Sequence, residues 1–257
     1  WEKAECKILQ EAVNFALKKA SLPKENIDFF LAGDLLNQTI SANFAARQLG
    51  LPFFGLYGAC STMAESMILG SMLIEGGYGD HVIAAVSSHH DTAERQYRFP
   101  TELGTQRPLT AQWTVTGAGA MVLARGEKGL RITGGTVGKV VDFGIKDQND
   151  MGSAMAPAAA DTIISYFRDT RTTPDDFDLI ITGDLAAIGK SLAQQLIEKA
   201  GYHLGNKYSD CGILIYDPTQ DTYAGGSGCG CSAAVTCGYL LQSMKAGKYK
   251  RIMMVGT

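Results

Sequence analysis

Apolar residues recur at two different spacings along the chain, and their alternation indicates the fold class. Residues 3–20 carry apolar side chains at helical spacing, which predicts a helix that ends before Pro23. Short, almost wholly apolar runs at 27–33, 52–57 and 81–87 predict strands that are buried on both faces. Helices are predicted between these strands, at 41–49 and 61–75. Alternating strands and helices favour βαβ units around a mostly parallel sheet.

The second part of the chain repeats the pattern of the first. Asp28-Phe-Phe-Leu-Ala-Gly-Asp34 resembles Asp178-Leu-Ile-Ile-Thr-Gly-Asp184. A glycine turn, a helix and a strand that follow Gly58-Ala-Cys60 return in the same order after Gly228. Because the similarities keep their order, we interpret them as one folding unit used twice. The other elements predicted are a strand at 118–124, an apolar run at 130–136 and a helix at 156–169.

The repeat divides the chain into an N-terminal half, 1–127, and a C-terminal half, 128–257. The sequence starts inside a predicted helix and stops in a predicted strand. The segment 89–114 is polar, contains two prolines and is too long for a simple connection, so it is a candidate site loop.

Composition limits the classes of function. Hydrophobic residues make up 46% of the chain and charged residues 19%, as in a compact globular protein. The 23 Lys and Arg against 26 Asp and Glu leave a net charge of -3, without the basic surplus typical of nucleic-acid binding. No apolar run is long enough to cross a membrane. The six cysteines are too unevenly placed for a disulfide scaffold, which favours free thiols in a reducing compartment.

Cys60 is the first candidate for chemistry. It stands in Tyr57-Gly-Ala-Cys-Ser-Thr-Met63, between a predicted strand and a predicted helix. A cysteine at such a turn projects at the carboxyl edge of the sheet, and the helix N-terminus favours its thiolate. A nucleophile needs this placement. The alternative is a small apolar side chain buried in a tight turn.

These features resemble a known superfamily. The duplicated α/β half, the Gly-Ala-Cys-Ser turn and Thr116-Gly-Ala-Gly-Ala-Met-Val-Leu123 are similar to thiolases and ketoacyl synthases. More specifically, residues 31–38, 54–63 and 87–97 resemble the stage V sporulation protein AD (SpoVAD) family of spore-forming bacteria. The resemblance implies an α/β, thiolase-like fold of two pseudo-symmetric βαβαβαββ halves, packed as a five-layer α-β-α-β-α sandwich. A half of this fold begins and ends with strands, so the resemblance also implies that terminal strands are missing from this chain. It further implies binding of dipicolinic acid.

The sequence departs from the condensing enzymes of this superfamily. Those enzymes pair the cysteine with a histidine and with a second histidine or asparagine from the other half. Here Gly183 and Asp184 stand at the first of these places, and the glycine-rich turn 225–231 contains neither residue type. The catalytic base and oxyanion donors are therefore absent from their expected positions. We infer a catalytically inactive fold in which Cys60 marks a disused nucleophile position.

The predicted pocket lies between the two repeats. Helix N-termini after Cys60 and after Gly230, with the N–H groups of glycine-rich turns, would suit a planar dicarboxylate. His89 or His90 could donate to it, as could an arginine of the loop, Arg95, Arg98 or Arg107. Asp34 and Asp184 would either cap the following helices or meet a cation that accompanies the ligand. The candidate ligand-binding residues are Cys60, Ser61, His89, His90, Asp34, Gly183, Asp184, Gly226 and Ser227.

Other glycine and cysteine motifs do not indicate a cofactor or a metal. Cys229, Cys231 and Cys237 lack a matching second pair, and their small neighbours indicate close helix packing instead. The turn 225–230 lacks the Gly-Lys-Ser/Thr ending of a phosphate loop. We therefore expect neither a metal nor a nucleotide.

Three functions remain open. The first is a thiolase-fold protein that binds dipicolinic acid (pyridine-2,6-dicarboxylate), alone or with calcium, for its uptake into the developing spore. The second is an acyltransferase or condensing enzyme of the ketoacyl-synthase type that uses Cys60. The third is a structural component of a membrane-associated complex. The family resemblance implies partners among the membrane-embedded stage V A proteins, a peripheral position on the inner spore membrane and, by analogy with thiolases, a homodimer.

Overall fold

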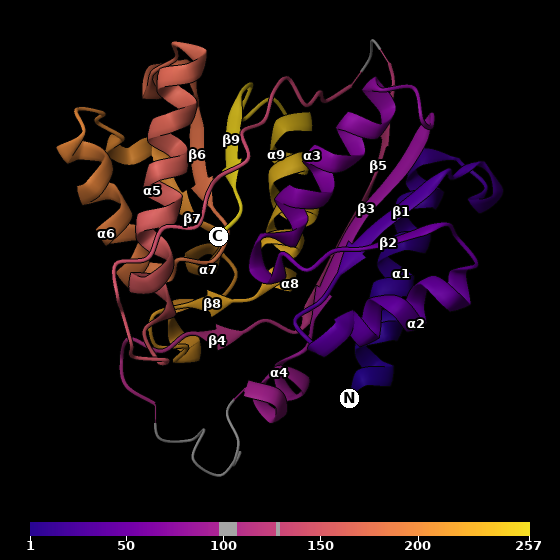
Figure 1. Ribbon diagram of the computed structural model, residues 1–257, viewed down its shortest axis with the longest axis horizontal. Helices are drawn as coiled ribbons and strands as arrows, with labels where there is room; N and C mark the ends of the chain where they lie inside the picture. The colour runs from indigo at the N-terminus through magenta and orange to yellow at the C-terminus, as the bar shows by residue number, and fades with distance from the viewer. Residues whose placement is uncertain (98–106, 127–128) are drawn as a thin grey trace.

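The computed structural model describes residues 1–97, 107–126 and 129–257 and has five layers. Figure 1 shows them from right to left: a layer of helices, a sheet, a central layer of helices, a second sheet and an outer layer of helices. This arrangement is the α-β-α-β-α sandwich expected from the sequence. The carboxyl end of the chain lies near the central layer (Figure 1).

The first sheet belongs to the N-terminal half. Its strands are β1 (Phe29–Gly33), β2 (Phe53–Gly55), β3 (His81–Ser88) and β5 (Gly117–Ala124). They lie in the order β2-β1-β3-β5, with β5 antiparallel to β3 and the other pairs parallel. The helices of this half are α1 (Glu2–Ala20) and α2 (Ile40–Leu49), which cover one face of the sheet, and α3 (Thr62–Glu75), which covers the other.

The second sheet belongs to the C-terminal half and is wholly parallel. Its strands β6 (Leu179–Thr182), β7 (Tyr208–Asp210) and β9 (Ile252–Val255) lie in the order β7-β6-β9. The outer helices are α5 (Met151–Thr170) and α6 (Ala186–Lys199). The central partner of α3 runs through α8 (Cys229–Ala234), a π-helical turn (Val235–Leu240) and α9 (Leu241–Lys245), and a short helix, α7 (Cys211–Leu214), follows β7.

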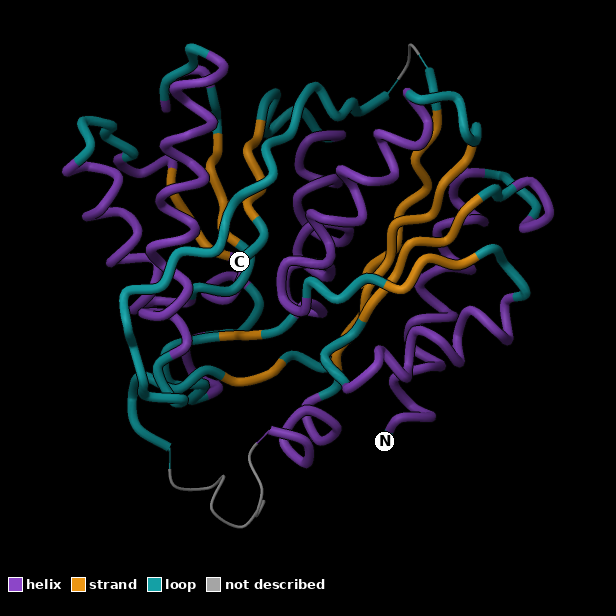
Figure 2. Tube along the Cα trace, in the orientation of Figure 1, coloured by secondary structure: helices purple, strands orange, loops and turns teal. Residues whose placement is uncertain are grey.

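Short elements join the two halves at one end of the layers. β4 (Trp113–Thr114) pairs in parallel with β8 (Gly226–Ser227), so the N-terminal half contributes a strand next to the glycine-rich turn of the C-terminal half. Figure 2 shows this pair below the two sheets, with α4 (His90–Tyr97) beside it. The predicted site loop thus contains a helix and a strand. Its residues 98–106, Arg98 included, lie outside the described part of the chain.

The internal repeat is present in the backbone as well as in the sequence. The Asp28 carboxylate accepts hydrogen bonds from the N–H groups of Asp80, at 2.7 Å, and His81, at 3.0 Å. The Asp178 carboxylate accepts from the residues that precede β9, Lys250 at 2.6 Å and Arg251 at 3.0 Å. Each aspartate therefore ties the start of one strand to the start of its parallel neighbour in the same way. The two halves are pseudo-symmetric, as the sequence predicted.

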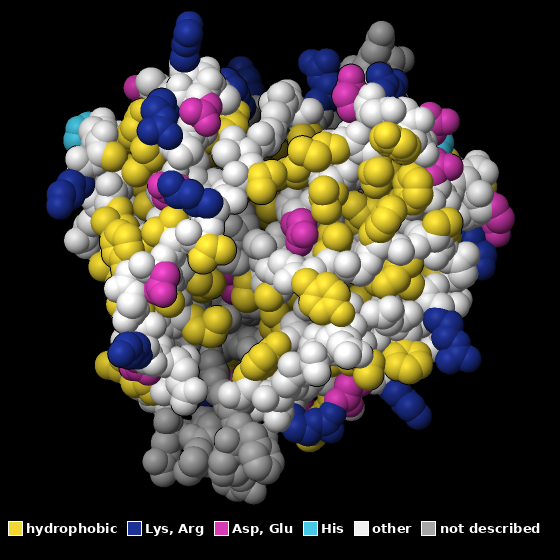
Figure 3. Space-filling model, viewed as in Figure 1, with side chains coloured by type: hydrophobic (Ala, Val, Ile, Leu, Met, Phe, Trp, Pro, Cys, Tyr) yellow, Lys and Arg dark blue, Asp and Glu magenta, His cyan; other side chains and the backbone are white. Residues whose placement is uncertain are grey.

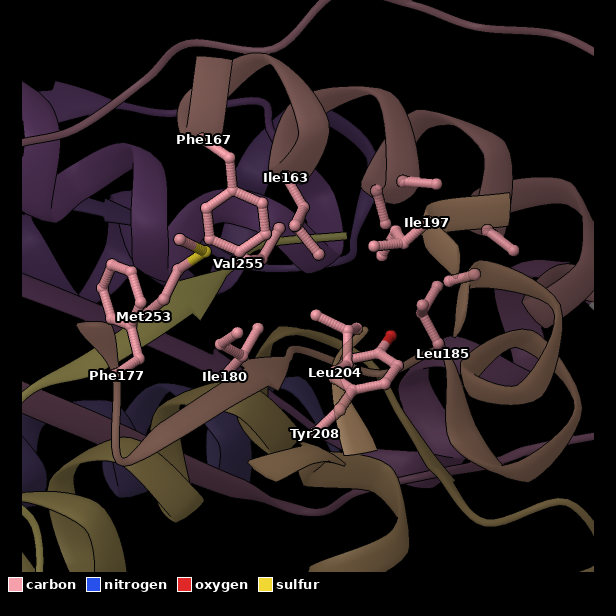
Figure 4. Packing of buried hydrophobic residues seen from close by; sticks show 14 residues of the cluster. Ile163, Phe167, Phe177, Ile180, Leu185, Ile197, Leu204, Tyr208, Met253 and Val255 are labelled. Atoms are coloured by element: carbon pink, nitrogen blue, oxygen red, sulfur yellow. The ribbon is translucent and has the colours of Figure 1, made fainter. Parts of the chain in front are cut away.

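Each half has its own hydrophobic core. In the C-terminal half, side chains from α5, α6 and the three strands meet between helices and sheet, as Figure 4 shows around Phe167, Ile180 and Ile197. A smaller cluster lies between the halves, where Met63 of α3 packs with Val86 of β3 and with Cys229 and Ala233 of α8. The central helices therefore share one core that neither half forms alone.

The apolar run 130–136 forms no strand. It is irregular and almost wholly exposed, with Leu130 and Ile132 among its accessible side chains. A strand requires a neighbouring backbone for its hydrogen bonds, and in the described chain none is paired with this segment. The expected boundary between the halves, 127/128, falls on residues outside the described ranges and stays a prediction.

The surface carries apolar side chains over the central layer. Figure 3 shows hydrophobic side chains gathered over α3, where Leu69 and Met72 are exposed. None of the helices in the described ranges has the length and apolar character needed to cross a membrane.

Candidate functional site

Cys60 lies at a strained turn between β2 and α3. The preceding residue, Ala59, has a φ of 45°, a left-handed conformation that a residue with a side chain adopts at a cost. A short 3-10 turn, Ala59–Ser61, then leads directly into α3. The strand-to-helix turn predicted for a nucleophile position is therefore present, and the structure shows in addition that it is strained. Such strain persists where the surrounding structure holds it in place.

The surroundings of Cys60 favour a neutral thiol. Its side chain is buried and lies beside the Asp184 carboxyl group. Burial, together with the negative charge of Asp184 and the nearby thiols of Cys229 and Cys231, raises the pKa of Cys60 well above its usual value. The expectation that the helix N-terminus would favour the thiolate is therefore wrong, because desolvation and a neighbouring acid outweigh the helix dipole.

Asp184 connects the two repeats. It follows β6 and accepts hydrogen bonds from the Gly228 N–H, at 2.6 Å, and from the Thr257 hydroxyl, at 2.7 Å. The Ser227 hydroxyl donates to it at 3.4 Å. Burial raises the pKa of this carboxyl group. Asp184 therefore brings Cys60 and Ser227 together, as the predicted site required, and holds the glycine-rich turn.

Asp184 does not cap the helix that follows it. The N–H groups of Leu185 and Ala186 donate instead to Asp210, at the end of β7, at 2.9 Å and 2.8 Å. Asp210 also accepts from the Thr182 hydroxyl at 2.6 Å. Burial raises the pKa of Asp210 to about 7. The sequence analysis did not identify this residue, because a strand of three residues carries too weak a pattern to place its end.

Asp34 caps the next helix of its own half. Its carboxylate accepts from the N–H groups of Leu36 and Ala42, both at 2.7 Å, and Ala42 lies in the first turn of α2. Burial raises the pKa of Asp34 to about 6. Of the two roles left open for the acids, the structure gives Asp34 the capping role. The described residues contain no group of three or more His, Cys, Asp or Glu that could hold a metal ion.

The helix N-termini expected to bind an external anion are partly occupied by the chain itself. At α8 the Gly230 N–H donates to the Ser88 hydroxyl at 3.1 Å, while the Gly228 N–H is held by Asp184. Before α3 both the N–H and the hydroxyl group of Ser61 donate to the Gly58 carbonyl, at 3.0 Å and 2.8 Å. These donors are satisfied within the fold, so an anion would have to displace internal hydrogen bonds to reach them.

The two predicted histidines lie at the start of α4: His89 precedes the helix and His90 is its first residue. The His89 Nδ1 atom accepts a hydrogen bond from the Asp91 N–H at 3.2 Å. The His90 ring is stacked on Trp113, with 4.4 Å between ring centroids. Burial lowers the pKa of both. In the described chain, neither is among the groups whose charge or hydrogen bonding acts on Cys60.

The remaining predicted residues are bound within the fold. Of the loop arginines, Arg95 pairs with Glu2, and Arg107 pairs with Glu94 at 2.7 Å. Gly183 allows the close approach of Thr257, whose hydroxyl would lie 3.1 Å from an added Cβ. The Gly226 carbonyl accepts from the Gln112 side-chain amide at 3.3 Å, and the same amide donates to the Asp184 carbonyl.

A cavity of about 340 Å³ opens beside the Cys60 turn. It lies between the loop that follows β1 and the last turn of α4. Its lining residues are Asp34, Leu35, Leu36, Asn37, Gln38, Thr39, Tyr57, Ala59, Gln96 and Tyr97. Asp34 is the only one of these that the sequence analysis assigned to the site. Gln96 and Tyr97 stand in the motif 87–97 that carried the family resemblance, and that was the only signal for them.

Glu5 is a further buried acid that sequence reasoning missed. It is wholly buried in α1 and accepts hydrogen bonds from the hydroxyl groups of Thr92, at 2.8 Å, and Ser87, at 3.3 Å. Burial and the charge of Asp34 raise the pKa of Glu5 to about 7. A glutamate in the first turn of a helix usually faces solvent, so the sequence gave no sign that this one joins α1 to β3 and α4.

Comparison with known proteins gives two kinds of similarity. A family model described as Stage V sporulation protein AD (SpoVAD) matches residues 1–257. The Stage V sporulation protein AD of Bacillus subtilis (strain 168) is 51% identical over 257 residues. That alignment covers 100% of this chain and 76% of the B. subtilis protein.

Similar solved structures include OleA and a 3-oxoacyl-[acyl-carrier-protein] synthase III. Xanthomonas campestris OleA, with bound lauric acid and lauroyl-CoA, superposes with a TM-score of 0.69 over 97% of this chain and 77% of its own, at 17% identity. The 3-oxoacyl-[acyl-carrier-protein] synthase III of Aquifex aeolicus VF5 gives a TM-score of 0.61 over 97% and 79%, at 18% identity. At these identities the similarity shows a thiolase-like fold alone.

Proposed function

The chain belongs to the stage V sporulation protein AD family, and from this premise we propose that it binds dipicolinic acid for uptake into the developing spore. The ligand would enter alone or with calcium, through the cavity beside Cys60. Tyr57 and Tyr97 are among its lining residues and bring aromatic rings to which a planar molecule can bind. In this proposal the identity of the ligand rests on the family, and its position rests on the cavity.

The observation that carries this proposal is the environment of Cys60. The strained turn of a nucleophile position is retained, yet the thiol lies beside a buried carboxyl group and its pKa is raised. A condensing reaction needs a thiolate and a base to form it. Cys60 has Asp184, Cys229 and Cys231 around it instead. We therefore propose that the site binds its ligand without covalent chemistry.

Titration calorimetry tests the binding proposal. Dipicolinate should give saturable heat with the full chain, measured in parallel with calcium and with a calcium chelator. Cys60→Ala should weaken binding, because the side chain lies beside the cavity wall. Cys6→Ala is the matched control, since Cys6 is also a buried cysteine but belongs to the core under α1. His90→Ala should weaken binding only if the ligand reaches the Trp113 side of α4. Absence of binding heat both with calcium and with the chelator would contradict the proposal.

Acyl transfer through Cys60 is the second candidate. The observation in its favour is the left-handed Ala59, since strain of this kind is costly and is retained at reactive turns. Incubation with acyl-CoA followed by intact-mass measurement separates the two functions. A covalent acyl adduct that disappears in Cys60→Ser would favour the enzyme. An unmodified mass over the same period is expected if the site only binds.

Uptake into a spore requires a passage through the membrane, and we propose that other proteins form this passage. We propose that this chain lies peripherally on the inner spore membrane beside the membrane-embedded stage V A proteins, and that it pairs as a homodimer. Co-purification of a tagged chain with those proteins from detergent extracts of sporulating cells tests the first part. Sedimentation of the purified chain tests the second.

A further inference from the structure

The last turn of α4 is fastened across the cavity by two hydrogen bonds. The Tyr97 hydroxyl donates to the Leu35 carbonyl, and the Asn37 N–H donates to the Gln96 side-chain oxygen at 3.0 Å. All four residues line the cavity. We call this pair of contacts the clasp. It joins the end of the only helix between β3 and β4 in the described chain to the loop after β1.

The clasp lies next to the Cys60 turn. Tyr97 lines the same cavity as Ala59, the residue that precedes Cys60, and 59% of Tyr97 is exposed. Burial and the charges of Cys60, Asp34 and Cys229 raise the pKa of the Tyr97 hydroxyl, in agreement with this position. Tyr97 is therefore placed where it can control access from the cavity to the Cys60 turn.

The opposite wall of the cavity is held in one conformation. Gln38, Thr39 and Ala59 line it, and their φ values of 55°, 47° and 45° are all left-handed. Non-glycine residues keep such angles only where neighbouring contacts impose them. Asn43 supplies one of these contacts, because its side-chain amide donates to the Thr39 carbonyl and hydroxyl oxygens, each at 3.0 Å. The Tyr97 hydroxyl is tied to the loop after β1 by its bond to the Leu35 carbonyl, so loss of that bond would free the side chain to rotate.

We propose that Tyr97 is the gate of this site and determines which sizes of molecule reach Cys60. Closed, the ring and the clasp admit only small molecules. Rotation of the Tyr97 side chain, with loss of its bond to Leu35, opens the route for larger ones. The proposal concerns access to the proposed binding site and rests on the proposed function only for the identity of the natural ligand.

Alkylation of the full chain by maleimides of two sizes tests the gate. N-methylmaleimide is the small probe and N-(1-pyrenyl)maleimide the large one, with the modification rate of each cysteine followed by peptide mass spectrometry. In Tyr97→Ala the large probe should modify Cys60 about tenfold faster than in the wild type, as expected for the loss of one or two modest hydrogen bonds and the ring. The rate at which the small probe modifies Cys60 should increase less.

Two further variants separate a gate from general loosening. Tyr97→Phe keeps the ring and loses the bond to Leu35, so it should give an intermediate rate. Tyr78→Ala removes an exposed tyrosine after α3, away from the cavity lining, and should leave the Cys60 rates unchanged. Cys6 and Cys211 are buried elsewhere and report unfolding within the same sample. Should Tyr97→Ala unfold, Tyr97→Phe and Gln96→Ala carry the comparison.

Two results would overturn the gate. One is a rate of Cys60 modification that does not depend on residue 97. The other is a rate that rises only in proportion to the modification rates of Cys6 and Cys211. The labelling needs no ligand, so it can fail or succeed independently of calorimetry. Faster modification of Cys60 in Tyr97→Ala, without dipicolinate binding to the wild type, would support the gate and contradict the proposed ligand. Dipicolinate binding with unchanged modification rates would support the ligand and contradict the gate.

Discussion

Buried acids are the most unusual residues of this chain. Glu5, Asp34 and Asp210 are all desolvated, and burial raises the pKa of each, to about 7, 6 and 7 respectively. Each is held by hydroxyl or backbone N–H donors, which partly offset the cost of burial. These carboxyl groups connect elements that are distant in sequence, so their protonation bears on how firmly the layers are joined.

The stability of the chain should fall as the pH rises through the range in which Glu5 titrates. Unfolded, Glu5 titrates near 4.5, and folded near 7. Between these values the native state keeps a proton that the unfolded state has released, so unfolding becomes easier with rising pH and the effect levels off above the folded pKa. Glu5→Gln should reduce the decline by roughly 3 kcal/mol.

Denaturant unfolding at pH 5 and at pH 8 measures this difference. Glu11→Gln, on the exposed side of the same helix, should retain the decline of the wild type. Asp34 and Asp210 contribute with the same sign as Glu5, so a smaller decline remains in Glu5→Gln. Equal declines in Glu5→Gln and the wild type would show that Glu5 is not the group responsible.

The residues of the site were predictable only where a pattern marked them. The Gly-Ala-Cys-Ser turn between an apolar run and a helix placed Cys60 correctly, and the internal repeat placed Asp184 near it. Asp210 caps α6 from a neighbouring strand, and Tyr97 reaches the site from the end of α4. Such contacts depend on the packing of distant segments, which no local spacing encodes.

Among the elements, α5 and α6 show how glycine sets the distance between two helices. An added Cβ at Gly189 would lie 2.5 Å from the Gly152 carbonyl oxygen, and one at Gly152 would lie 2.6 Å from the Leu185 carbonyl oxygen. The helices therefore touch through backbone at this point, and the outer layer closes tightly over the C-terminal core.

Gly189→Ala should destabilise the chain by about 1–3 kcal/mol, because the new methyl group must push the two backbones apart. The loss is expected even though alanine is the better helix former. Gly238→Ala serves as the matched control, since an added Cβ there meets nothing within 4 Å, and it should be neutral or stabilising by up to about 1 kcal/mol. Thermal or denaturant unfolding compares them. A stabilised Gly189→Ala would contradict the close contact.

The long elements were predictable, and of the short strands β2 was predicted whereas β4, β7 and β8 were not. Apolar runs and helical spacing mark the buried strands and the long helices. The predicted helix 3–20 and the predicted strand 81–87 therefore correspond to Glu2–Ala20 and His81–Ser88. β4 and β8 have two residues each and arise only because the halves meet. The run 130–136 has the composition of a strand and no described partner, which shows that pairing, and not composition, makes a strand.

The whole molecule is joined by a core that both halves build. Met63 is fully buried and packs against Val86 on one side and against Cys229 and Ala233 on the other. Met63→Ala should cost about 2–5 kcal/mol and lower the transition of the entire chain. Met72→Ala, on the exposed side of α3, should change stability little.

Urea unfolding followed by both tryptophan fluorescence and circular dichroism examines this joint core. The wild type and Met63→Ala should each give one transition with coincident midpoints by the two methods. Two separated transitions, with Met63→Ala shifting only one of them, would mean that the halves unfold independently.

The environment of the Cys60 thiol depends on residues from both halves of the molecule, Asp184 among them. The reactivity of this thiol can therefore show whether the two halves are assembled. Cys60, Asp184 and Gly228 come from three separate segments, and only their assembly forms the environment of the thiol. If the N-terminal half were produced apart from the C-terminal half, Cys60 would behave as an ordinary exposed cysteine until the two polypeptides met. Protection of one thiol would then count reassembled molecules, which makes fragment complementation of this fold measurable by simple chemical labelling.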